Sequence, residues 1–413
     1  MSERAFHQDR EPDPSTDAAD DEDEADDARE VTTGAEAAII ALEEAGVDMA
    51  FGVQGGAIMP VYDALYDSDI EHITMAHEQG AAHAADAYGI VSGEPGVAMA
   101  TSGPGATNLV TGIADASMDS DPMIALTGQV ATDFVGNDAF QEVDTVGITQ
   151  PITKNNYFAG DPDTLGADVS EAFALAESGR QGPTLVDLPK DASKAETDVQ
   201  PVSPETPDTY HPPETADEAV IEAAAETIED ADRPVILSGG GVIKGEASDE
   251  LRAFARKYDI PVITTMPGLG SFPETDDLSL GMAGMHGTGA ANLAITNTDV
   301  LIGVGTRFDD RLTGGVDSFA PDAEVIHVEI DAAEINKNIY ADYPLLGDAE
   351  RVLEQLEDEL TDAPDADEWR EQCQTWKDEY PLDYEAPEDE PIKPQHVVER
   401  FAEMADDDAI VTT

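Results

Sequence analysis

A glutamate stands near the start of a predicted helix whose other residues are mostly alanine. The helical face of Glu78 carries Ala81, Ala82 and Ala85, at positions i+3, i+4 and i+7. A carboxylate among such small apolar neighbours loses hydration, which raises its pKa. These features fit a group that exchanges a proton with a bound ring nitrogen.

A structural role for Glu78 is also open, because a glutamate in the first helical turn interacts favourably with the helix macrodipole. The local pattern alone favours that role, although a capping box is excluded because Met75 stands three residues earlier. His77 and His83, six residues apart, point to different faces and make a poor metal pair. We therefore predict packing or solvent contact for both histidines, and no metal ligand in the chain.

Two arginines flank two aspartates in GTRFDDRLTG, residues 305–314. Arg307 and Arg311 are spaced i, i+4, so a local salt-bridge cluster is the simpler interpretation. Because the chain has few basic residues, the pair could instead bind an anion. A substrate carboxylate or a cofactor phosphate would suit the guanidinium fork.

Glycine-containing turns follow four predicted strands, at residues 53–57, 101–108, 238–245 and 303–308. Parallel sheets bind ligands at the carboxyl ends of their strands, where glycine lets the backbone approach phosphates or rings. None of the turns matches GxGxxG, and a single glycine after a strand is usually simple turn chemistry. Four such turns in two regions favour a cofactor-binding α/β protein over a structural one.

Short apolar runs alternate with amphipathic helical patterns from residue 31 onward. The predicted strands are 47–53, 94–103, 121–128, 183–189, 233–241, 260–265, 298–308 and 323–331. The predicted helices are 34–45, 78–92, 105–118, 164–178, 216–230, 247–258 and 394–404. This alternation predicts an α/β fold with two complete, doubly wound parallel-sheet domains.

Composition divides the chain into six segments. We expect a disordered acidic tail at 1–30, an α/β domain at 31–190, a linker at 191–215, a second α/β domain at 216–361, a second linker at 362–391, and the start of a third domain at 392–413. The third domain is expected to open with a strand at 407–413.

The charge balance excludes several classes of partner. The 413 residues carry 20 basic and 90 acidic side chains, a net charge of −70. Such a surface repels nucleic acid and anionic membranes, and no apolar run is long enough to span a bilayer. Strong salt screening tolerates dense carboxylates, which suggests a halophilic protein. Cys373 is the only cysteine, so an internal disulfide is excluded. The acidic N-terminus is no signal peptide, and a cytoplasmic location is expected.

Ordered motifs mark a family resemblance over about residues 31 to 413. The sequence contains, in this order, GVQGGAIMPVYDALYDSD, MAHEQGAAHAADAYG, ATSGPGATNLVTGIADA, LTGQV, DAFQE, GPTLVDLPKD, TTMPGLGSFP, GMHGTGAAN, GTRFDDRLTG and LGDAE. It resembles the catalytic large subunit of acetolactate synthase. HEQGA with SGPGATN marks the thiamine-diphosphate decarboxylases and carboligases, and DAFQE, GMHG and FDDR narrow the resemblance to acetolactate synthase.

The resemblance implies a thiamine diphosphate site in the first domain. Glu78 is implied to bind N1′ of the aminopyrimidine and to promote the imino tautomer that takes the thiazolium C2 proton. The other implied residues are Val53, Gln54, Gly55 and Gly56 beside the thiazolium, Thr101, Pro104 and Asn108 on the pyrimidine side, Phe140 and Gln141 on a loop presented by a neighbouring subunit, and Lys190 and Arg311 in the substrate channel. Val53 and Gln54 replace the family's usual Tyr-Pro. Contacts there are mostly backbone, so the geometry is expected to survive.

The resemblance also implies FAD in the second domain, as a largely structural cofactor with no net redox role. The matching residues are Arg180, Gly239, Gly240, Gly241, Thr265, Met266, Gly284, Met285, His286, Gly305, Arg307, Asp309, Glu329, Ile330 and Asp348.

The implied reaction condenses two pyruvates, or pyruvate and 2-ketobutyrate, with release of CO2, in branched-chain amino acid biosynthesis. The implied assembly is a homodimer or a dimer of dimers, with a separate regulatory small subunit. Two alternatives stay open: another thiamine-diphosphate 2-keto-acid decarboxylase or carboligase, and a non-catalytic FAD-binding fragment.

In the family, a third domain holds the diphosphate and Mg²⁺ through Gly-Asp-Gly followed by an asparagine. The present sequence contains no Gly-Asp-Gly, and LGDAE at 346–350 is the nearest segment to it. We therefore expect the Mg²⁺ ligands to lie outside this chain, and negligible activity from the chain alone.

Overall fold

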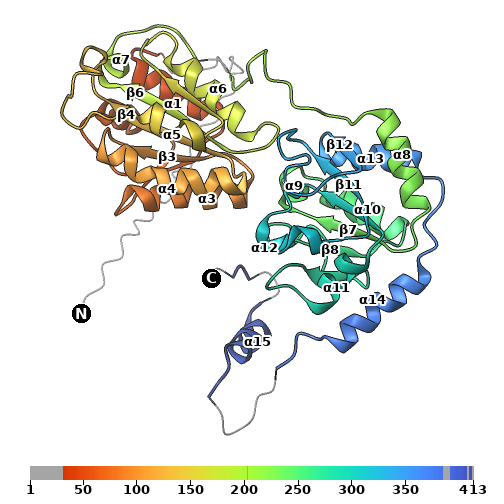
Figure 1. The fold of residues 1–413 in the computed structure, drawn as a ribbon. Coiled ribbons are helices and arrows are strands. Elements are labelled where there is room, and N and C mark those ends of the chain that lie inside the picture. The colour runs from red at the N-terminus through yellow and green to blue at the C-terminus, as the bar shows by residue number, and fades with distance from the viewer. Residues whose placement is uncertain (1–30, 202, 385–390, 407–408, 412–413) are drawn as a thin grey trace, which may run out of the picture.

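The computed structural model describes residues 31–201, 203–384, 391–406 and 409–411. Figure 1 shows two α/β domains joined by an extended segment. The tail expected at 1–30 lies outside the described residues, as does most of the strand expected at 407–413, and 409–411 form no strand. None of the helices in the described part of the chain is both long and apolar enough to cross a membrane.

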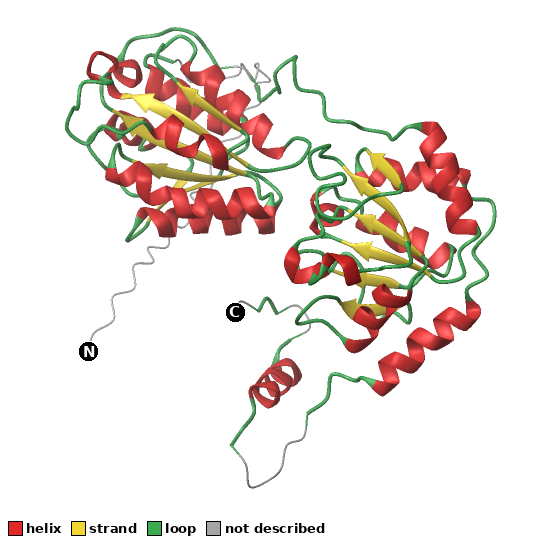
Figure 2. Ribbon diagram, viewed as in Figure 1, coloured by secondary structure: helices red, strands yellow, loops and turns green. Residues whose placement is uncertain are grey.

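The first domain is a six-stranded parallel sheet with helices on both faces (Figure 2). Its strands are β1 (Met49–Gly52), β2 (Glu71–Thr74), β3 (Gly96–Ala100), β4 (Met123–Gln129), β5 (Asn155–Phe158) and β6 (Pro183–Pro189). Its helices are α1 (Gly34–Glu44), α2 (Met59–Leu65), α3 (Glu78–Ser92), α4 (Pro104–Asp119), α5 (Thr145–Thr149), α6 (Leu165–Glu177) and α7 (Lys190–Lys194), with 3₁₀ turns η1 (Thr132–Phe134) and η2 (Gln150–Ile152). Every residue of β3, β4 and β6 is buried, as expected of central parallel strands.

The second domain repeats this plan with a different strand order. Its strands are β7 (Pro234–Ser238), β8 (Val262–Thr264), β9 (Ser279–Met282), β10 (Val300–Val304), β11 (Glu324–Glu329) and β12 (Tyr343–Leu346). Its helices are α8 (Glu218–Glu229), α9 (Gly240–Lys244), α10 (Ser248–Lys257), α11 (Gly289–Asn297), α12 (Asp310–Thr313), α13 (Ala349–Glu359) and α14 (Asp367–Glu379), with the 3₁₀ turn η3 (Val316–Ser318). The helix α15 (Pro394–Met404) follows it in the chain. Separate hydrophobic clusters cover the two faces of the sheet.

Strand order places one switch point in each sheet. The first sheet has the order β2-β1-β3-β4-β6-β5, so the chain turns to the opposite side between β1 and β3. The second has the order β12-β11-β10-β7-β8-β9, the 3-2-1-4-5-6 arrangement of dinucleotide-binding folds, with its switch between β7 and β10. Ligands of open α/β sheets bind at such points, beyond the carboxyl ends of the strands.

The predicted fold class, two doubly wound parallel-sheet domains, is confirmed. The linker prediction for 362–391 is wrong at 367–379, where the chain forms α14. Trp369 and Cys373 of this helix are buried against the second domain, and Trp369 Nε1 donates to Pro234 O at 3.1 Å. The acidic composition of the segment reflects only the exposed face of the helix.

Candidate functional site

The turns after β1 and β3 meet at the first switch point. Ala57 N donates a hydrogen bond to Thr101 Oγ1 at 3.2 Å, and Val53 N donates to Met99 O at 3.2 Å. A Cβ at Gly55 would lie 2.4 Å from Thr101 Cβ. Only glycine fits at position 55, so the backbone of this turn is held directly against the turn after β3.

Replacing Gly55 by alanine is expected to push the two turns apart and to destabilise the protein by about 1–3 kcal/mol, the usual cost of overpacking. Gly56 is a matched control, because nothing lies within 4 Å of a Cβ at that position. Gly56→Ala should change the free energy of unfolding by less than about 0.5 kcal/mol. Urea denaturation of both variants measures the difference, and equal stabilities would contradict this packing.

Glu78 begins α3 at the same edge of the sheet. Asn108 Nδ2 donates to Glu78 Oε2 at 3.0 Å, and a Cβ at Gly105 would lie 3.5 Å from Glu78 Oε1. The carboxylate is half-buried and lies between the first turns of α3 and α4, while the alanines of its helical face are fully buried. The helix is capped by His77, whose exposed Nδ1 accepts from Gln79 N at 3.0 Å.

Several other predicted residues lie at this edge of the first sheet. Pro104 begins α4, Gln54 Nε2 donates to Thr74 Oγ1 at 3.1 Å, and the half-buried Lys190 begins α7 directly after β6. A Cβ at Gly103 would lie 2.5 Å from Gln141 O, which fixes the 141 backbone beside the turn after β3.

Phe140 and Arg311 are placed differently. Phe140 precedes Gln141 and is 87% exposed. Arg311 lies on α12 of the second domain, where its exposed guanidinium is 4.0 Å from Asp310. Within the described part of the chain, no contact brings the Arg311 side chain to Glu78.

A buried carboxyl group tethers the loop that carries Gln141. Asp187 of β6 accepts hydrogen bonds from Thr127 Oγ1 at 2.7 Å and from Gln129 Nε2 at 2.9 Å. Gln129 Nε2 also donates to Val143 O at 2.9 Å, two residues after Gln141. Burial raises the pKa of Asp187 to about 7, against the two hydrogen bonds that lower it. Asp187 therefore binds a proton more readily in the folded protein than in the unfolded chain.

Stability that depends on this proton is fully present below the unfolded pKa of 3.8 and is lost as the pH rises through about 7. Asp187→Asn keeps the group neutral at every pH. The free energy of unfolding of the variant minus that of the wild type should therefore rise with pH, by at most about 1.4 kcal/mol per pH unit, and level off near pH 7. Urea denaturation at a series of pH values tests this, and parallel profiles for the two proteins would contradict it.

The second switch point is built from closely packed glycines. Gly241 N donates to Gly305 O at 3.0 Å, and Gly239 N donates to Val304 O at 2.9 Å. A Cβ at Gly239 would lie 2.1 Å from Gly305 O, and Gly305 has a φ of +56°. The turns after β7 and β10 can approach this closely only because neither carries side chains there.

A cavity of about 260 Å³ extends from these glycines to the first domain. The predicted FAD residues that line it are Arg180, Gly239, Gly240, Gly241, Thr265, Gly305, Arg307, Asp309, Glu329, Ile330 and Asp348. Met266, Gly284, Met285 and His286 do not line it, and Met285 N instead donates to Arg311 O at 3.2 Å. The prediction missed residues at the ends of α4 and α6 and two in the second domain: Met118, Asp119, Ser120, Glu177, Gly179, Gln181, Lys244 and Glu334. Tertiary packing alone brings these segments to the cavity, and no local motif signals them.

Ion pairs join the two domains around the cavity. Arg180 of the first domain contacts Asp331 at 2.9 Å and Glu334 at 2.7 Å. In two further pairs the second domain supplies the cation: Lys244 pairs with Asp121 of the first domain, and Arg307 pairs with Asp119 at 3.2 Å. Figure 1 shows the α9 side of the second domain facing the first domain.

Two buried carboxyl groups, those of Glu329 and Glu334, stand at the cavity wall. Burial raises the pKa of Glu329 to about 7, although its Oε1 accepts from Ile330 N at 3.0 Å and from Asp331 N at 3.2 Å. Among the described residues, the buried Glu334 Oε2 has no hydrogen-bond partner. Carboxyl oxygens of this kind can accept hydrogen bonds from the hydroxyl or N–H groups of a bound nucleotide.

Comparison with known proteins gives two domain matches and a set of close relatives. The thiamine pyrophosphate enzyme N-terminal TPP binding domain matches residues 32–148, and the thiamine pyrophosphate enzyme central domain matches 221–356, together more than half of the chain. The chain is 49% identical over 395 residues to the acetolactate synthase large subunit of Parasynechococcus marenigrum. It is 48% identical over 389 residues to that of Corynebacterium glutamicum. It is 50% identical over 379 residues to a probable acetolactate synthase large subunit of Methanocaldococcus jannaschii.

These alignments cover 94%, 93% and 90% of this chain but 64%, 62% and 64% of the three relatives. The chain therefore spans just under two thirds of the length of the relatives that it matches. The first match covers β1 to β4 with their switch point, and the second covers the whole of the second sheet. The chain belongs to the thiamine pyrophosphate enzymes and is homologous to the large subunits of acetolactate synthase.

Proposed function

We propose that this chain forms part of the catalytic subunit of an acetolactate synthase. The reaction condenses two pyruvates, or pyruvate and 2-ketobutyrate, with release of CO2. The observation that carries the proposal is the carboxylate of Glu78 between α3 and α4, hydrogen-bonded by Asn108 at the β1/β3 switch point. The identity to acetolactate synthase large subunits along almost the whole chain supports it.

The residues at the first switch point fit thiamine pyrophosphate. The carboxylate of Glu78 faces Gly105, since its Oε1 would lie 3.5 Å from a Cβ placed on that glycine. Nothing lies within 4 Å of a Cβ placed on Gly56. When bound, the cofactor supplies the electron sink for decarboxylation and carbon–carbon bond formation. Glu78 would hold a proton at the pyrimidine N1′, and Asn108 would fix the position of the Glu78 carboxylate. Lys190 and Arg311 are proposed to line the path of the 2-keto acid.

We assign FAD to the cavity between the domains, as a structural cofactor. The glycines after β7 and β10 expose strand-end backbone to the cavity, as a dinucleotide requires. Glu329 and Glu334 supply acceptors, and Arg180 and Arg307 supply the positive charge that suits a pyrophosphate. Mg²⁺ is proposed as a further cofactor, with ligands other than the residues assigned here.

The family and the net charge also suggest how the protein assembles and where it is located. The catalytic unit is proposed to be a homodimer or a dimer of dimers in the cytoplasm, with a separate regulatory small subunit. The net charge of −70 suits a cell interior with high salt, where carboxylates are screened.

Product analysis of the whole protein with pyruvate, thiamine pyrophosphate, Mg²⁺ and FAD tests the proposal. The expected result is 2-acetolactate with one CO2 for every two pyruvates. Acetaldehyde as the main product would favour the related 2-keto-acid decarboxylases and overturn the assignment. The same measurement with added 2-ketobutyrate shows which acceptor is preferred.

A further inference from the structure

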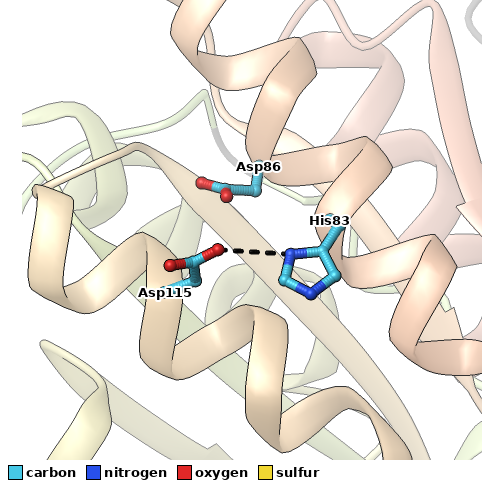
Figure 3. A group of neighbouring side chains, drawn as sticks. All are labelled: His83, Asp86 and Asp115. Atoms are coloured by element: carbon cyan, nitrogen blue, oxygen red, sulfur yellow. Dashed lines mark ion pairs between the residues drawn. The ribbon is translucent and has the colours of Figure 1, made fainter. Parts of the chain in front are cut away.

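Three side chains outside both cofactor sites converge between α3 and α4 (Figure 3). His83 and Asp86 stand one helical turn apart on α3, and Asp115 stands on α4. His83 Nδ1 lies 3.3 Å from Asp115 Oδ2. One possible ligand atom from each of the three residues lies within 4.8 Å of the other two. The helices approach closely here because Gly112 faces Ala82, where a Cβ on the glycine would lie 2.4 Å from the alanine Cβ.

Asp86 is a buried carboxyl group that lacks a full set of partners. It is 7% exposed, and its Oδ1 has no hydrogen-bond partner among the described residues. Burial, followed by the neighbouring Asp121 and then Asp115 and Asp119, raises its pKa to about 7. A buried carboxylate is unstable unless a proton or a cation neutralises it.

The basic residues nearby are already paired with other acids. Lys244 pairs with Asp121, and Arg307 pairs with Asp119. The imidazole of His83 pairs with Asp115, while the recorded neighbour of Asp86 is the carboxyl group of Asp121, which has the same charge. The cluster therefore carries excess negative charge at a position that second-domain cations do not neutralise.

One separation in the cluster matches that of two ligand atoms on a metal ion. In a tetrahedral site with metal–ligand bonds of about 2.0 Å, two ligand atoms lie about 3.3 Å apart. That separation matches the 3.3 Å between His83 Nδ1 and Asp115 Oδ2, which is long for a charged hydrogen bond. One nitrogen and two carboxylate oxygens form a ligand set for Zn²⁺, and the partial exposure of His83 and Asp115 leaves room for a water in the fourth position.

We propose that His83, Asp86 and Asp115 form a zinc site that clamps α3 to α4. Both helices begin at the first switch point, with Glu78 on α3 and Asn108 on α4. A metal held one to two turns further along fixes the two helices relative to each other. It thereby holds the hydrogen bond between Asn108 and Glu78 in place. The site is structural and takes no part in the proposed reaction.

Titration of the purified chain with Zn²⁺ in concentrated KCl tests the site, because salt suppresses non-specific binding to an acidic surface. We expect one tight site per chain, and His83→Ala or Asp115→Asn should weaken it more than about 100-fold, since even outer-shell changes cost 10- to 100-fold. Saturating Zn²⁺ should raise the Tm of the wild type by roughly 5 °C and leave that of the variants unchanged. Asp63→Asn and His211→Ala, which alter an exposed acid and an exposed imidazole, should bind Zn²⁺ like the wild type.

Cobalt provides a second readout that does not depend on stability. Co²⁺ bound to the wild type should give the visible absorption of a tetrahedral nitrogen and oxygen site, and His83→Ala should lose it. Far-UV circular dichroism establishes that His83→Ala is folded, as expected for a half-exposed side chain. Equal Zn²⁺ affinity in the wild type and His83→Ala, or no tight site in folded wild type, would overturn the proposal and leave a proton on Asp86 as the neutralising cation.

Discussion

Replacing Glu78 by glutamine is expected to lower the rate of acetolactate formation by the whole protein about 100- to 10,000-fold. The range is that of a positioned general acid or base. Glutamine preserves the size of the side chain and can still accept the hydrogen bond from Asn108 Nδ2. It cannot exchange a proton with a ring nitrogen. Steady-state kinetics with pyruvate measure the effect, which should fall on kcat more than on KM.

A matched control separates this effect from a general change of charge. Glu71→Gln removes an exposed carboxylate from β2 in the same domain and should leave the rate within about twofold of the wild type. Flavin content should be the same in the wild type and both variants, since no residue of β2 or of the start of α3 lines the proposed FAD cavity. A Glu78→Gln enzyme with nearly full activity would remove Glu78 from the chemistry and return it to the macrodipole role.

Replacing Gly305 by alanine is expected to abolish FAD binding, with a loss of affinity of more than about 100-fold. A Cβ at this position would lie 2.6 Å from Gly241 Cα, so the turns after β7 and β10 must separate. Overpacking of this kind costs about 1–3 kcal/mol, and the positive φ of Gly305 adds strain. Because both turns line the cavity, their separation deforms the proposed flavin site. Fluorescence titration with FAD measures the affinity.

Gly314 offers a control for the strain alone. Its φ of +58° nearly equals the +56° of Gly305, but nothing lies within 4 Å of a Cβ at Gly314. Gly314→Ala should therefore bring the backbone strain without the collision, and FAD affinity should stay near that of the wild type. If both alanine variants lose FAD equally, backbone strain rather than the contact with Gly241 explains the loss.

The sequence predicted the inner strands of both sheets but none of the edge strands. The eight strands predicted in the two domains all occur, whereas 409–411, the described part of the strand expected at 407–413, form no strand. The four strands that were missed are β2, β5, β9 and β12, the outermost strands of the two sheets. An inner parallel strand is buried on both faces and reads as a continuous apolar run. An edge strand such as β2 has no buried residue and leaves no such run.

The candidate sites also divide into residues that a local sequence pattern predicts and residues that only tertiary packing brings together. Glu78 could be singled out because its helical face is a local pattern, and the glycine turns could be placed at strand ends. The wall of the cavity around Met118 and Ser120 could not, because those residues reach it only when the two domains pack together. The pairing of His83 with Asp115 was missed for the same reason. The spacing of His77 and His83 argued against a metal pair, and the partner of His83 lies on the next helix.

Flavin bound to the purified chain is the most direct measure of the cofactor architecture proposed here. Both walls of the interdomain cavity come from these 413 residues, so the chain contains every group assigned to the site. The predicted result is a flavin absorption spectrum at one FAD per chain, retained through purification in high salt and lost in Gly305→Ala. A folded chain that binds no FAD even when the cofactor is added in excess would contradict the assignment of the cavity.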